Sequence, residues 1–103
     1  MRVRSEAGTT RELTLDDADA WVRFESADPV TVTVPPQSRV RFSLGTTITL
    51  FQAGEGAVTI QFARGDAVVS TPETLVLAKQ YAAAMLVNVG GDAWDVAGYL
   101  TAA

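Results

Sequence analysis

The stretch that decides the fold is Val30-Thr31-Val32-Thr33-Val34, followed directly by Pro35-Pro36. Its apolar and polar side chains alternate, which is typical of a β-strand with one buried and one solvated face. The β-branched side chains of Val and Thr suit a pleated strand. Proline cannot donate a ladder hydrogen bond, so we expect this strand to end at Val34.

The same alternation returns further along the chain, and turn residues separate the runs. Apolar and polar side chains alternate over residues 39–44, 47–50 and 58–62, and two last strands are expected over residues 82–89 and 94–100. Alternation favours antiparallel pairing, since parallel strands usually have continuous apolar runs. The pattern therefore predicts an all-β fold, a compact antiparallel β-sandwich or barrel of about eight short strands.

The expected turns contain the residues that turns require. Residues 53–56, Ala-Gly-Glu-Gly, read as a hairpin connection with two glycines available for positive φ, and residues 90–92 join the last two strands. Residues 64–66 spell Arg-Gly-Asp, a tripeptide known from cell adhesion, for which a plain β-turn is the simpler interpretation. We find no linker and no internal repeat, so residues 10–103 read as a single β domain.

Three segments lack the strand pattern or compete with it. Residues 15–20 could form one helical turn capped by Asp16. Residues 79–86 contain good helix formers, but they continue into Val87-Asn88-Val89-Gly90-Gly91, so we expect a strand there. Residues 1–9 are polar without a repeating pattern and are expected to form an N-terminal arm.

Composition excludes several classes of function. The net charge is −4, from 12 acidic and 8 basic side chains, which does not provide the basic stripe that nucleic-acid binding needs. The chain has no Cys and no His, so disulfides, thiolate nucleophiles, Cys/His zinc sites and His-based triads are excluded. No segment approaches the ~20 apolar residues that span a bilayer, and the start has no apolar run of a secretory signal. We therefore expect a soluble chain made in a cytoplasm, with no cofactor.

The carboxylates offer two alternatives to a purely structural role. Asp16, Asp17 and Asp19 crowd one turn, which could hold Ca²⁺, although a solvated turn explains them more simply. Asp92 and Asp95 flank Trp94 and could act as the carboxylate pair of a glycosidase. The spacing fixes neither site, so the expectation is that the chain is not an enzyme and has no metal ligand that the sequence can name.

The large amphipathic side chains are Trp21, Tyr81, Trp94 and Tyr99. Trp94 alternates with Val96 and is assigned to the core, where its N–H would reach a partner. Trp21 and Tyr99 could equally belong to the core or to an interface with a partner.

Several short motifs follow one another in a characteristic order. They are Leu-Thr-Leu-Asp-Asp-Ala at 13–18, Trp-Val-Arg-Phe at 21–24, Val-Thr-Val-Thr-Val-Pro-Pro at 30–36, Phe-Ser-Leu-Gly-Thr at 42–46, the run at 48–58, Gln-Tyr-Ala at 80–82 and the ending at 90–100. This order resembles a small β domain recurrent in virion proteins of tailed bacteriophages, in tail fibres, receptor-binding tips and capsid decoration proteins. Ser43, Gly91 and Tyr99 depart from the pattern, in which Pro, Thr and Asp are usual.

The resemblance implies a bacteriophage virion component, assembled in the host cytoplasm as a homotrimer, with no catalytic residue to transfer. Our first hypothesis is a capsid decoration protein that binds and stabilises the capsid surface, with the major capsid protein or another virion protein as its partner. The expected contact residues are Arg2, Arg4, Arg11, Trp21 and Tyr99. The alternatives are a tail-fibre or tail-tip module that binds a host receptor or glycan, and a wall-degrading hydrolase.

Overall fold

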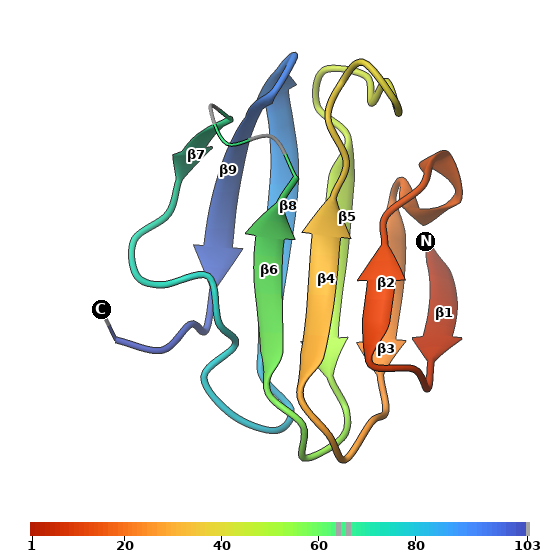
Figure 1. Cartoon of the computed structure of the whole chain (residues 1–103), viewed down its shortest axis with the longest axis vertical. Helices are drawn as coiled ribbons and strands as arrows, with labels where there is room; N and C mark the ends of the chain where they lie inside the picture. The colour runs from red at the N-terminus through yellow and green to blue at the C-terminus, as the bar shows by residue number, and fades with distance from the viewer. Residues whose placement is uncertain (64, 66, 103) are drawn as a thin grey trace.

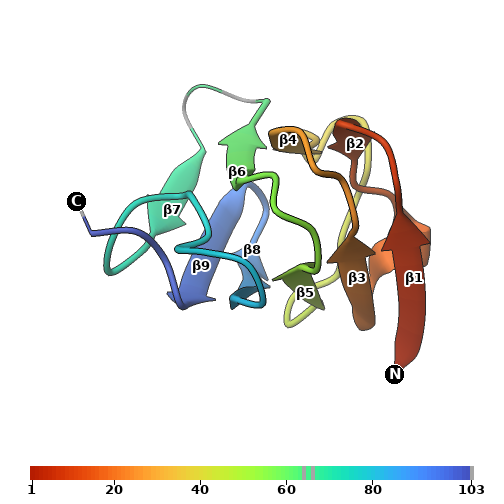
Figure 2. The ribbon, with the colours of Figure 1, turned by 90° about the horizontal axis from the view of Figure 1, so that it is seen from below.

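The computed structural model describes residues 1–63, 65 and 67–102. The chain is a small β-solenoid: it winds through about three turns, and each turn places one strand in each of two facing sheets (Figures 1 and 2). The turns comprise β1 (Arg2–Glu6) with β2 (Thr10–Glu12), β3 (Ala20–Phe24) with β4 (Val30–Val34), and β5 (Thr47–Gln52) with β6 (Val58–Phe62).

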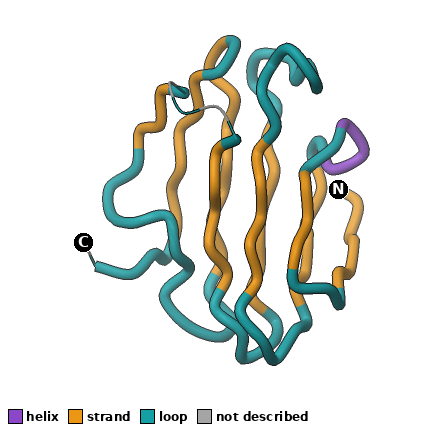
Figure 3. The backbone as a smooth tube through the Cα atoms, viewed as in Figure 1, coloured by secondary structure: helices purple, strands orange, loops and turns teal. Residues whose placement is uncertain are grey.

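Corresponding strands of successive turns pair in parallel, β1 with β3 and β5, and β2 with β4 and β6. The larger sheet is completed by β7 (Val68–Ser70), β8 (Ala83–Gly90) and β9 (Ala93–Gly98), in the order β1-β3-β5-β8-β9-β7. There β8 runs antiparallel to β5 and β9. One short 3-10 helix, η1 (Leu15–Asp17), precedes β3 (Figure 3).

The expectation of an antiparallel sandwich or barrel is wrong, although the alternation that suggested it is real. In β4 the side chains of Val30, Val32 and Val34 are buried, while Thr31 and Thr33 face outward. Parallel strands read as continuous apolar runs when both faces of their sheet are covered. In this solenoid each sheet has only one covered face. Apolar and polar side chains therefore alternate along its parallel strands, as they do along antiparallel ones.

The expectation that the chain has no internal repeat is also wrong. Trp21 of β3 pairs with Thr49 of β5, and Val30 of β4 pairs with Val58 of β6, so both strand pairs have the same offset of 28 residues. The second and third turns are thus equivalent strand–corner–strand units. Stacking such units buries the face that one unit alone would leave in water.

Residues 53–56 form a corner between two sheets, not the expected hairpin. The amides of Ala53 and Gly54 donate to the carbonyl of Phe24 at 2.8 and 2.9 Å, and the amide of Gly56 donates to that of Ser26 at 3.0 Å. A Cβ at Gly54 or Gly56 would lie closer than 3.0 Å to the backbone of the preceding turn. These glycines therefore permit close stacking of two corners.

Further local expectations have mixed outcomes. Residues 39–44 form no strand: Phe42 is buried in the core and Val40 packs against it, but Leu44 is 76% exposed. The strand expected over residues 82–89 and its hairpin partner are confirmed as β8 and β9. The helical turn near residue 15 is confirmed, but its N-cap is Thr14, not Asp16.

The N-terminal segment also has a defined place. Residues 2–6 of the expected N-terminal arm form β1, paired with β3. Arg64 and Asp66, two residues of an expected turn, lie outside the described residues. Within the described ranges, no helix is long and apolar enough to cross a membrane.

The hydrophobic core fills the space between the two sheets. Its largest fully buried apolar side chains are Phe24, Leu13, Ile48, Leu50, Leu77 and Leu86. Trp94 is 2% exposed, which confirms its assignment to the core, and its ring packs edge-on against Phe42 with centroids 5.4 Å apart.

Candidate binding surface

The outer faces of the two sheets differ sharply in chemistry. On the smaller sheet Thr10, Thr31 and Thr59 lie in one row across β2, β4 and β6, and Glu12, Thr33 and Gln61 form the next row. This threonine face is polar along all three strands, as expected of a surface that stays in water.

The outer face of the larger sheet, here called the apolar face, carries mostly apolar side chains. Val3, Met85 and Val89 are 66%, 43% and 43% exposed. Of the outward positions on the described strands β1, β3, β5, β8 and β9, Arg23 and Asp95 alone are charged. The other apolar side chains on this face are Trp21, Phe51, Ala83, Val87, Ala93 and Ala97.

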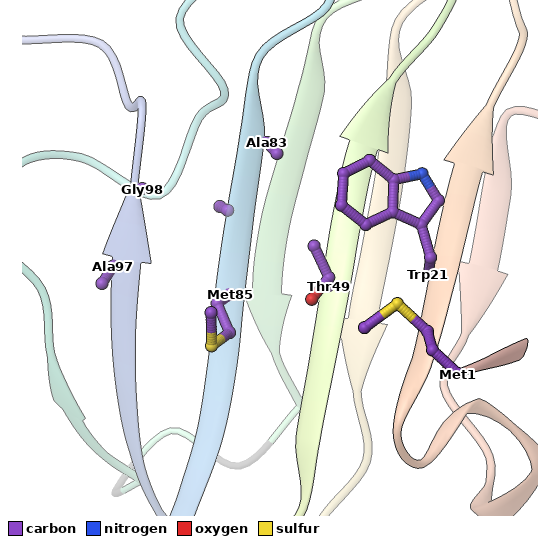
Figure 4. A pocket seen from close by; sticks show the side chains of 8 residues that line it. Met1, Trp21, Thr49, Ala83, Met85, Ala97 and Gly98 are labelled. Carbon is purple, nitrogen blue, oxygen red and sulfur yellow. The ribbon is translucent and has the colours of Figure 1, made fainter. Parts of the chain in front are cut away.

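A hollow of about 310 Å³ lies in the middle of the apolar face (Figure 4). Trp21, Thr49, Met85 and Ala97 occupy one cross-strand row, and small side chains in this row leave space between Trp21 and Met85. The hollow is lined by Met1, Trp21, Thr49, Ala83, Ala84, Met85, Ala97 and Gly98.

An aromatic row borders this hollow. The ring centroids of Trp21 and Phe51 are 5.2 Å apart, and those of Phe51 and Tyr81 are 6.2 Å apart. The guanidinium carbon of Arg23 lies 5.3 Å from the centroid of Phe51, a cation–π geometry. Tyr81 has a φ of 70° and is 67% exposed. A bulky residue in the left-handed region is unusual, and such strain concentrates at binding sites.

The N-terminal end of the solenoid is closed by charged side chains instead of apolar ones. Arg4 and Arg11 lie in register with the buried Val22 and Val32, so they point toward the interior. There they meet the fully buried carboxylate of Asp17, at 3.3 Å from Arg4 and 2.5 Å from Arg11. These charged side chains cover the end of the core, the role that terminal repeats have in solenoids.

Glu6 completes this charged cap. Its carboxylate accepts a hydrogen bond from the amide of Gly8 at 2.9 Å and another from Arg11 at 2.8 Å. The Gly8 bond and then the Arg11 bond lower the pKa of Glu6 below its ordinary 4.5. Burial opposes the charge of Arg11, but its bonds to Asp17 and Glu6 outweigh burial and raise the pKa of that guanidinium.

The structure separates the five expected contact residues. Arg2 donates to the carbonyl of Asp16, and Arg4 and Arg11 bind within the charged cap, so all three guanidinium groups are engaged inside the chain. Trp21 lies on the apolar face, and Tyr99 is 56% exposed beside Lys79, whose Nζ lies 5.5 Å from the ring centroid.

Phe51 and Met85 also lie on this surface beside Trp21, and the local sequence pattern does not indicate them. The signal that could have found them is the 28-residue offset, because it places Phe51 beside Arg23 and Thr49 beside Trp21. From there Met85 follows by pairing of β8 with β5.

The acidic candidates do not converge on one site. Asp17 is fully buried in the charged cap, whereas Asp16 and Asp19 are exposed, so the solvated turn that we expected is correct for two of the three carboxylates. Asp92 accepts the amide of Gln37 at 2.7 Å, whereas Asp95 faces outward on β9. Across the described residues, no group of three His, Cys, Asp or Glu side chains could hold a metal ion.

No protein-family model, no curated protein and no solved structure matches this chain.

Proposed function

We propose that the chain is a non-catalytic structural protein whose apolar face is a protein–protein interface. The observation that carries this proposal is the contrast between the two outer faces of one small solenoid. The threonine face is polar throughout, whereas the apolar face exposes Val3, Met85 and Val89 around a hollow. A contiguous exposed apolar surface with few charges is typical of an interaction site.

The lining of the hollow favours a protein partner over a glycan. Among the described residues that line it, the Thr49 hydroxyl and the Trp21 indole N–H are the polar side-chain groups, and Thr49 is only 7% exposed. A sugar site needs several convergent hydrogen-bonding groups, whereas an apolar hollow suits an apolar side chain. Trp21 then acts as a rigid anchor of the kind enriched at protein interfaces.

The ordered motifs between Leu13 and Leu100 support a virion context for this interface. Within that context, we propose capsid decoration first: the chain binds the head and stabilises it. A tail-fibre or tail-tip module is the alternative. In both roles the apolar face is covered by protein in the assembled particle.

Cryo-electron microscopy of particles tests this proposal. Bacteriophage heads that lack the chain are mixed with purified protein and imaged. We expect regular occupancy, with the apolar face of each bound copy covered by protein. Ala97→Arg places a charge in the hollow and should abolish binding of the protein to the heads. Gln61→Arg adds the same charge to the exposed threonine face and should leave binding unchanged. Equal occupancy by both variants, or a bound copy whose apolar face stays in solvent, contradicts the proposal.

A further inference from the structure

We propose that the occupant of the apolar face is a second copy of this chain, packed face to face about a two-fold axis. This inference rests on the proposed function, because it names the partner of the same interface. It comes from the position of the two charges on that face.

Arg23 and Asp95 lie diagonally opposite one another on the apolar face. Across the sheet Arg23 is level with Phe51 and Ala83, whereas Asp95 is level with Val87 and Thr47. The two residues are therefore three strands and four residues apart, roughly 14 Å across the strands and 13 Å along them. The midpoint between them falls between Thr49 and Met85, at the hollow.

This placement makes the face complementary to itself. Consider a two-fold axis in the plane of the face that passes through that midpoint, perpendicular to the Arg23–Asp95 line. Rotation about this axis exchanges the positions of Arg23 and Asp95. Arg23 of each copy then lies over Asp95 of the other, so one operation forms two identical ion pairs. A two-fold interface of this isologous kind is the commonest in soluble oligomers.

The same operation sets the packing of the sheets. Because the diagonal lies near 45° to the strands, the strands of the two copies cross at close to a right angle, which is an established mode of sheet packing. Trp21 of one copy comes over the Thr47 and Val87 positions of the other. Phe51 of one copy then lies near Ala97 of the other, and the two Arg23–Asp95 pairs lie on either side of this apolar centre.

The two charged groups are available for this contact. Asp95 is exposed and makes no ion pair with any other described residue. Arg23 lies 3.6 Å from Glu25, and both side chains are at least 40% exposed. A guanidinium has five N–H donors, so Arg23 can keep this neighbour and still donate to a partner carboxylate.

The area of the face is sufficient for a specific dimer. Five strands about 4.8 Å apart and about six residues long cover roughly 480 Å². Two such faces bury about 1,000 Å² in total, the lower bound for a specific interface. We therefore expect a reversible dimer with a dissociation constant in the micromolar range.

Sedimentation velocity over a concentration series tests the dimer with a charge swap. Arg23→Asp and Asp95→Arg, each alone, place like charges opposite one another and should raise the dissociation constant by about tenfold or more. The double variant restores opposite charges and should return the constant to within a few-fold of the original. Gln61→Arg on the threonine face is the matched control and should leave it unchanged. Far-ultraviolet circular dichroism verifies that each variant keeps its β-sheet.

Three results would overturn the inference: a monomer at several hundred micromolar, a trimer insensitive to both charge changes, or a double variant as weak as the single ones. The particle images separate this failure from that of the proposed function. If the capsid covers the apolar face of single bound copies, the second copy is wrong and the interface stands. If Ala97→Arg still occupies the particle, the proposed interface itself is wrong.

Discussion

Arg11 donates to the carboxylate of Asp17 across 2.5 Å, and that carboxylate is completely shielded from solvent. The same carboxylate also accepts the amide of Thr14 at 3.0 Å and lies 3.3 Å from Arg4. One buried group thus ties η1 to both strands of the first turn. The N-terminal turn is held in place by the ion pairs that Arg4 and Arg11 form with Asp17.

Replacing Asp17 by Asn should destabilise the fold strongly. The change leaves Arg4 and Arg11 without their shared countercharge, and breaking a buried ion pair in this way costs about 3–5 kcal/mol. Urea denaturation measures the free energy of unfolding. Asp16→Asn is the control, since the side chain of Asp16 is exposed, and we expect a change below about 0.5 kcal/mol. Equal losses for both variants would contradict the role of the charged cap.

The charged cap also makes stability depend on acidity through Glu6. The pKa of Glu6 is lowered in the folded chain, so its contribution is complete above its ordinary value of 4.5 and is lost as the pH falls through the lowered value. Glu6→Gln should cost about 1 kcal/mol at neutral pH. Unfolding curves from pH 7 to pH 3 should show this difference shrinking below pH 4.5. A difference that stays constant across the range would show that the Glu6 charge does not act.

The sequence was sufficient to place several strands and to assign which side chains enter the core. The valines of β4 and Trp94 are buried as alternation requires. Alternation could not show whether neighbouring strands are parallel or antiparallel, because any sheet with one solvent-exposed face has this alternating pattern. It also failed at residues 39–44, where Phe42 is buried from a loop. The feature that distinguishes a solenoid is the 28-residue spacing between equivalent strands of successive turns, and not the alternation within one strand.

The corner glycines show the same ambiguity. Gly54 and Gly56 suggest a hairpin in the sequence, because glycine serves both tight turns and close backbone approach. We expect Gly56→Ala to cost at least about 2 kcal/mol, since its Cβ would collide with the carbonyl of Asp28. Gly65→Ala meets no atom within 4 Å and should change the free energy of unfolding by less than about 1 kcal/mol. The thermal unfolding midpoints of the two variants are compared. Equal midpoints would argue against close stacking of the two corners.

The candidate surface was predictable only in part. Trp21 was identified as a possible contact, but nothing local in the sequence shows that Phe51 and Met85 lie beside it. That neighbourhood depends on pairing between strands distant in the chain. The arginines near the start suggested a surface role, whereas Arg4 and Arg11 point inward because they lie in register with the buried Val22 and Val32.

At Tyr81 the backbone conformation is unfavourable for a tyrosine, whereas the contact of its ring with Phe51 is favourable. Its φ of 70° suits glycine, so Tyr81→Gly relieves strain of about 1 kcal/mol and offsets the lost contact with Phe51. Its free energy of unfolding should match that of the original chain, whereas Tyr81→Val should be about 1–2 kcal/mol less stable. Urea unfolding distinguishes the two. A Val variant as stable as the Gly variant would show that the backbone there is not constrained.

Everything about the apolar face depends on the parallel register of the stacked turns. Backbone nuclear Overhauser contacts in the isotope-labelled protein measure that register directly. We predict contacts between Val22 and Leu50 and between Val32 and Ile60, which pair across successive turns. Contacts that instead pair residues 48–52 with residues 58–62, as in a hairpin, would contradict the solenoid and the surface built on it.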